Sequence, residues 1–98
     1  MPTFETRPRF DREFRRLSRE LQSAFLAALP VFIEALRVKP ASFPPRLRVK
    51  RVEGLAGVWE MSFAADGRAT FASGPEVVAG EPHVIWRRVG DHSIFSDP

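Results

Sequence analysis

The sequence VWEMSFAADGRATFA, residues 58–72, indicates two β-strands joined by a tight turn, and the rest of the architecture follows from it. Apolar and polar residues alternate on both sides of Ala65–Gly67, and Asp-Gly is a strong turn signal. A two-residue Asp-Gly turn would leave Arg68 unpaired in the core, which costs several kcal/mol. We therefore predict a three-residue loop, Ala65–Gly67, with Gly67 in the left-handed conformation and Ala64 opposite Arg68.

This loop gives the hairpin one buried and one open face, because successive side chains of a strand point to opposite sides. The face expected to pack under helices carries Trp59, Met61, Phe63, Ala69 and Phe71. The open face carries Glu60, Ser62, Arg68 and Thr70. The same register places Glu60 opposite Ala72, about 13 Å along the sheet from Arg68.

A last strand, HVIWRRV at 83–89, follows a connection rich in Gly and Pro and should run antiparallel to its neighbour. Its end then lies beside Arg68, so that the following GDHSIF, residues 90–95, crosses the same corner of the open face. We expect His92 and Phe95 to lie there.

Two basic residues and one histidine of this strand are placed by the same alternation. Arg87 and Arg88 point to opposite faces, and the pattern leaves open which of them lines the open face. His83 begins the strand and lies about 20 Å from His92, so the two histidines cannot share a site.

Two helices are expected before the hairpin, because apolar residues recur at helical spacing at Phe10, Phe14 and Leu17, and then at Leu21, Ala24, Phe25, Ala28, Leu29, Phe32 and Leu36. The first helix covers residues 8–17 and is opened by Pro8. The second extends to about residue 37 and can be capped by Ser18. Pro30 must kink or split it, because proline cannot donate to the carbonyl of Leu26.

With TFET at residues 3–6 as a brief first strand, the elements predict an α+β fold. A helix hairpin packs on one face of a small, mainly antiparallel four-stranded sheet in the order β-α-α-β-β-β. Because 98 residues cannot build two cores, we expect one domain, 1–98.

The composition, 44% hydrophobic and 28% charged, is that of a soluble globular protein. No apolar run could cross a bilayer, and MPTFETRPRF lacks a secretory segment, so we expect a cytoplasmic protein without a membrane partner. The absence of cysteine excludes disulfides and thiol chemistry, and two histidines argue against a zinc site. No metal and no cofactor is expected.

Positive charge is concentrated in residues 37–51, which carry six Lys or Arg and no acid. Thirteen of the fifteen cations in the chain are arginine, whose planar guanidinium matches phosphate. The stretch RLRVKRV, residues 46–52, alternates as an extended segment and supplies the candidate RNA-binding residues Arg46, Arg48, Lys50 and Arg51. A polyanion or an acidic protein segment is the natural partner, and a merely solvated face is the alternative.

Arginine, histidine and an aromatic ring at one corner suggest RNA cleavage without a metal. In that reaction the 2′-hydroxyl attacks the adjacent phosphate, which needs a base, an acid and a cation. Histidine is the side chain suited to acid or base work near neutral pH, so His92 is the candidate for that role. Arg68 can hold the phosphate, and Phe95 can stack on an unpaired base.

The order of elements and the motifs GLAGVWEMSF, GRATF, HVIWRRVG and GDHSIF resemble the RelE/ParE superfamily of toxins from type II toxin–antitoxin modules. The ending is most similar to the YafQ branch, with one residue fewer. The resemblance implies that Arg68 is the family's strand arginine, His92 the catalytic histidine and Phe95 the base-contacting aromatic. It further implies an mRNA endonuclease that acts on the ribosome and is held inactive by an antitoxin.

The chain departs from the family on its second long strand, where Glu60 and Ser62 replace lysines or a histidine. Glu60 is a candidate general base, by analogy with a glutamate in another branch. The expected catalytic residues are thus Arg68, His92 and Glu60, and Arg88 joins the RNA-binding set. Two alternatives remain: a ParE-like inhibitor of DNA gyrase that acts by binding, and a degenerate member kept as an antitoxin-binding module.

Overall fold

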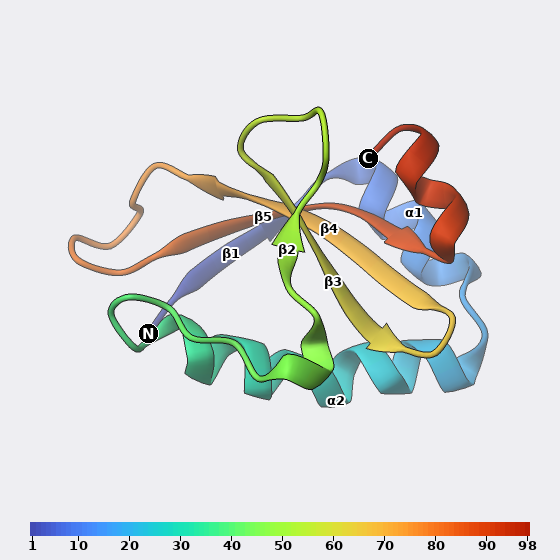
Figure 1. The fold of residues 1–98 in the computed structure, drawn as a ribbon, viewed down its shortest axis with the longest axis horizontal. Helices are drawn as coiled ribbons and strands as arrows, with labels where there is room; N and C mark the ends of the chain where they lie inside the picture. Colours follow the sequence, from blue (N-terminus) through green and yellow to red (C-terminus); the bar gives the residue numbers. More distant parts are fainter.

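The computed structural model describes residues 1–98 and contains two α-helices and a five-stranded mixed sheet (Figure 1). The elements are β1 (Thr3–Thr6), α1 (Pro8–Arg16), α2 (Arg19–Leu36), the 3₁₀ helix η1 (Pro45–Leu47), β2 (Lys50–Arg51), β3 (Val58–Ala64), β4 (Gly67–Gly74), β5 (His83–Gly90) and the 3₁₀ helix η2 (His92–Ser96). The expected α+β fold is confirmed. Neither helix is long and apolar enough to cross a membrane.

The strands follow the order β1-β5-β4-β3-β2, with β1 parallel to β5 and every other pair antiparallel. The sheet has five strands where the sequence predicted four. The additional strand is β2, because Lys50–Arg51 of the extended basic stretch forms a ladder with Glu60 and Trp59.

The helices begin as predicted, and of the two outcomes expected at Pro30, a kink or a break, the break does not occur. Pro8 opens α1, and the Ser18 hydroxyl accepts a hydrogen bond from the Leu21 amide at 3.2 Å as the cap of α2. Pro30 does not split α2, which continues to Leu36. Both Pro30 and Leu26 are exposed, so water can bind the Leu26 carbonyl that proline leaves without a donor.

The core lies between α2 and the face of the sheet that it covers (Figure 1). Trp86 is 2% exposed at its centre, and Phe25 meets it edge-on with ring centroids 5.2 Å apart. Phe32 packs edge-on against Phe71 at 4.9 Å. Met61 and Ala69 are fully buried, and Trp59 and Phe63 are partly buried against the same cluster, so the predicted buried face of the hairpin is confirmed.

The predicted hairpin loop is wrong, although the faces are right. Ser62 lies opposite Arg68 and Ala64 opposite Gly67, so the turn consists of two residues and Phe63 forms a β-bulge. Gly67 is not in the left-handed conformation. The bulge supplies the extra residue that the loop was expected to supply, and Arg68 stays off the core side.

A second irregularity separates the two arginines of β5. Thr70 pairs with Arg88 and Phe71 with Trp86, so Arg87 is the extra residue on β5. Trp86 therefore points into the core while Arg88 shares the open face with Thr70. The predicted antiparallel pairing of β4 with β5 is confirmed, with Arg68 opposite Gly90.

His83 fastens the edge strand β1 to β5. Its Nδ1 lies 2.7 Å from the Thr3 hydroxyl and its Nε2 lies 2.9 Å from a carboxylate oxygen of Glu5. The ring is buried, and a neutral imidazole meets both partners, because Nδ1 accepts from the hydroxyl while Nε2–H donates to the carboxylate. His83 therefore has a structural place far from the tail, as expected.

Candidate nucleic-acid interface

The largest cavity is a groove of about 610 Å³ between α2, η1 and the end of β3. Its floor is apolar and comes mainly from Ala24, Ala27, Ala28 and Val31 of α2, with Leu47 and Phe63. Three arginines line it as well: Arg46, Arg48 and Arg68. The groove joins two parts of the chain that the sequence singled out separately, the basic stretch and the strand arginine.

Arg68 does not extend over the open face of the sheet. Its Nη1 donates to the carbonyl oxygens of Ala64, Ala65 and Gly67, at 3.0, 3.3 and 3.0 Å. These bonds hold the guanidinium at the hairpin turn, where it faces the groove beside α2. The cation is therefore oriented, and it lies at the end of the sheet instead of above it.

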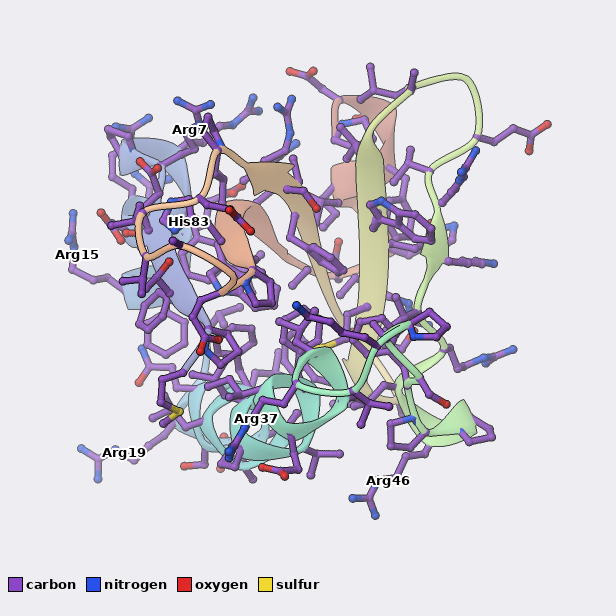
Figure 2. The ribbon with its side chains drawn as sticks, turned by 90° about the vertical axis from the view of Figure 1, so that its left-hand side faces the viewer. Arg7, Arg15, Arg19, Arg37, Arg46 and His83 are labelled. Atoms are coloured by element: carbon purple, nitrogen blue, oxygen red, sulfur yellow. The ribbon has the colours of Figure 1, made fainter.

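The basic stretch divides between two surfaces. Arg46 and Arg48 face the groove, and Figure 2 shows the Arg46 side chain extending away from the body of the protein. Arg48 has a φ of 48°, in the left-handed region. Lys50 and Arg51 lie further along in β2, where the Arg51 guanidinium sits 5.3 Å from the centroid of the Trp59 ring.

Glu60 lies closer to Arg68 than the sequence suggested. It pairs with Thr70, not Ala72, so Arg68 is its diagonal neighbour, at about 7–8 Å instead of about 13 Å. The Glu60 side chain is only 13% exposed, and its carboxylate is 3.7 Å from Nζ of Lys50.

The tail residues His92 and Phe95 form a pair on η2, with ring centroids 5.0 Å apart and the rings perpendicular. His92 is exposed and Phe95 half-buried, while Ile94 between them is 3% exposed and anchors η2. In Figure 1, η2 lies on the side of the sheet opposite α2. The predicted position of the tail over the open face is thus found.

Arg68 and the tail make separate sets of contacts. The Arg68 guanidinium is bound at the hairpin turn and lines the groove, whereas the tail contacts Thr70 of β4 and Arg88 of β5. Sequence periodicity placed Arg68 and the tail at one end of the sheet, but it could not fix the direction of a long side chain.

Arg88 has a structural role in this conformation. Its Nε and Nη2 bind the Glu13 carboxylate of α1, and its Nη1 donates to the carbonyl oxygens of Ile94 and Asp97. Burial would raise the pKa of Glu13, but the hydrogen bonds and charge of Arg88 and the Val89 amide outweigh it and lower that pKa. Arg88 was expected to bind RNA, but while the tail is in place its guanidinium is bound to Glu13 and to the tail carbonyls.

Two further arginines, Arg7 and Arg9, were not among the residues that the sequence singled out. Arg7 and Arg9, at the start of α1, lie with Arg87 and Arg88 of β5 around a second, smaller hollow. Figure 2 shows Arg7 at the junction between β1 and α1. Nearly eighty residues separate the two pairs in sequence, so only the parallel pairing of β1 with β5 brings them together.

Similar folds occur among solved structures of toxins. The YoeB/ParE toxin from Agrobacterium tumefaciens superposes with a TM-score of 0.65 at 13% identity, over 92% of this chain and 98% of that one. The E. coli DinJ-YafQ complex gives 0.59 at 10% identity, over 95% and 96%. The intact E. coli RelBE toxin-antitoxin complex gives 0.58 at 14%, over 93% and 96%.

The chain has the RelE/ParE toxin fold. No protein-family model and no curated protein matches the sequence itself. The resemblance stated from the motifs is therefore borne out at the level of the RelE/ParE fold, including its YafQ-like relatives. The matches cover 92–95% of this chain, so the shared fold extends over nearly its whole length.

Proposed function

We propose that this protein is the toxin of a type II toxin–antitoxin pair. The observation that carries the proposal is the structural likeness over more than nine-tenths of the chain to toxins such as YafQ and YoeB/ParE. Two of the similar structures are complexes of a toxin with its antitoxin, so the expected partner is a small antitoxin protein. The basic stretch suits an acidic segment of that partner.

For its activity we propose metal-independent cleavage of mRNA, associated with the ribosome, by attack of the 2′-hydroxyl on the adjacent phosphate. His92 is exposed and free to exchange a proton with the RNA, and Phe95 beside it offers a ring to a base. Arg46, Arg48 and Arg68 supply the cations that hold the backbone. Glu60 is proposed as the general base.

Expression in bacterial cells, with mapping of RNA 5′ ends, tests the activity. Wild type should arrest growth and generate new mRNA ends, and His92→Ala combined with Arg68→Ala should abolish both. Arg19→Ala, which removes an exposed arginine outside the groove, is the matched control and should behave as wild type. Growth arrest that persists in the double variant would overturn the assignment of these residues.

The binding of the Arg68 guanidinium to carbonyls of its own turn favours one alternative, inhibition of DNA gyrase by binding alone, because that activity needs no free catalytic cation. A supercoiling assay with purified gyrase distinguishes the two. Inhibition by wild type and by the His92→Ala variant alike, without new RNA ends, would establish this alternative in place of the endonuclease. A chain that neither arrests growth nor inhibits gyrase would be a degenerate member kept as an interaction module.

A further inference from the structure

A hollow of about 200 Å³ beside η2 is lined by the four arginines Arg7, Arg9, Arg87 and Arg88, by Asp97 and by Pro98, with no other residue. Its lining is thus almost wholly cationic apart from one carboxylate. Clusters of guanidinium groups repel one another unless an anion lies between them. Here the chain itself supplies that anion.

Donors from β4, β5 and α1 converge on the oxygen atoms of Asp97 and Pro98. Arg9 Nη1 lies 2.9 Å from Oδ2 of Asp97, and Arg88 Nη1 lies 3.0 Å from its main-chain oxygen. Arg87 Nε and the Thr70 hydroxyl both donate to the main-chain oxygen of Pro98, at 3.3 and 3.1 Å. Three guanidinium groups and a hydroxyl aimed at three neighbouring oxygens are the donor set that a phosphate group takes.

Two of these donors are held in place without the tail. Thr70 is fully buried in β4, and the Arg88 side chain is 13% exposed with two of its nitrogens bound to Glu13. These two donors would therefore stay in place if Asp97 and Pro98 moved away. This preorganisation lowers the entropic cost of binding an anion there.

The carboxylate of the occupying segment is held by a surface contact. The Asp97 side chain is 76% exposed, and its ion pair with Arg9 is a surface contact of the kind that contributes little. Ile94 anchors η2 through burial, so only the residues after Ser96 need to move. The hydrogen bond from Arg9 and its charge lower the pKa of Asp97, which keeps this carboxylate an anion at neutral pH.

We propose that Arg9, Thr70, Arg87 and Arg88 form a cradle for a phosphate group of the RNA backbone, and that Asp97–Pro98 occupies it as an internal competitor. The inference rests on the proposed function, because it assigns a second phosphate position to the same RNA. The cradle adjoins η2, which carries the exposed His92–Phe95 pair. RNA that contacts this pair can place its next phosphate in the cradle once the segment lifts.

Binding of a labelled oligouridine to the purified full chain, followed by fluorescence anisotropy, tests the competition. Asp97→Asn should bind about two- to five-fold more tightly than wild type, because the competing charge is gone. Asp91→Asn is the matched control: it changes net charge equally at a carboxylate outside the cradle, and should tighten binding by less than about two-fold. Equal effects of the two substitutions would overturn the competitor role.

A second pair of variants tests the cradle itself. Arg87→Gln should weaken binding by about three- to ten-fold and reduce the salt dependence by about one phosphate contact. Arg12→Gln removes an equal charge from an exposed position of α1 and should change both much less. Equal losses in the two variants would show that net charge alone matters, and would overturn the cradle.

Inorganic phosphate separates failure of the cradle from failure of the proposed function. In NMR spectra, phosphate should shift the Arg87 Nε–H resonance of Asp97→Asn at lower concentration than in wild type. A response to phosphate without RNA binding by any variant would overturn the RNA assignment and count against the endonuclease. RNA binding whose affinity is unchanged by both Asp97→Asn and Arg87→Gln would overturn the cradle alone.

Discussion

At the scale of single residues, the ion pair between Glu13 and Arg88 connects three parts of the fold. The Glu13 carboxylate accepts hydrogen bonds from Arg88 and from the Val89 amide, and Arg88 in turn donates to main-chain oxygens of the tail. One half-buried ion pair thus joins α1, β5 and η2. A carboxylate in this position is stabilised in its charged form, which lowers its pKa in the folded chain.

Glu13→Gln should therefore lower the free energy of unfolding at neutral pH by about 2 kcal/mol, because Arg88 loses its charged partner. The pKa of Glu13 is lower in the folded than in the unfolded chain, so its contribution is present above the unfolded value and is lost as the pH falls. Urea unfolding of both proteins from pH 7 downward measures this. The two stabilities should converge progressively as the pH falls below the unfolded-state value of about 4.3, and a constant difference would contradict the role.

At the scale of elements, the β3–β4 hairpin depends on a close approach between Gly67 and the bulged Phe63. A Cβ atom built on Gly67 would lie 2.5 Å from the Phe63 ring. The sequence marked Gly67 for its backbone freedom, yet its φ is not positive. The glycine is required here for space, since the bulge turns the ring across it.

Gly67→Ala should lower the free energy of unfolding by about 1–3 kcal/mol, because the methyl group overlaps a ring packed against the core. Chemical denaturation measures the loss. The double variant Gly67→Ala with Phe63→Leu should recover part of it, since leucine leaves room for the methyl group. Gly74→Ala is no suitable control because it meets the His83 and Ile85 side chains, whereas Gly54→Ala meets nothing and reports backbone strain alone.

At the scale of the whole molecule, one cluster of buried residues contains members of both helices, η1, β3, β4 and β5. No element has a core of its own, and the radius of gyration of 12.7 Å is that expected for a single domain of this length. The expected single domain stays a prediction, and unfolding of the chain can test it.

The full chain should unfold in one cooperative transition. Trp86 lies at the centre of the core and Trp59 at its margin, so tryptophan fluorescence follows the loss of core packing. Far-UV circular dichroism follows the loss of secondary structure, and in a single transition both signals should give the same midpoint in urea. Two separated midpoints would show independent units and contradict the single domain.

Much of this arrangement was present in the sequence. Alternation in residues 58–72 and 83–89 gave the strands and the side chains that face the core, and Pro8 and Ser18 marked the helix starts. These features were predictable because they depend on neighbours a few residues away. The motifs also led to the RelE/ParE fold, which the solved toxin structures bear out.

The candidate site depended on contacts that no local pattern records. Arg68 bends to the carbonyls of its own turn, a direction that alternation does not fix, and Arg88 is bound by Glu13, which lies 75 residues away in the sequence. The bulges at Phe63 and Arg87 shifted the register of the strand pairs. The alternation of apolar and polar residues does not show where such a shift occurs.

The amino-acid sequence by itself determined both helices, four of the five strands, their order and the buried face of the sheet, because hydrophobic periodicity is a local property of the chain. Only the tertiary structure determined which charges meet: it turned the Arg68 guanidinium to the carbonyls of the hairpin turn, and it brought Arg9 and Arg87 around Asp97. The physical reason is the length of the arginine side chain, whose guanidinium can reach hydrogen-bond acceptors that periodicity does not record.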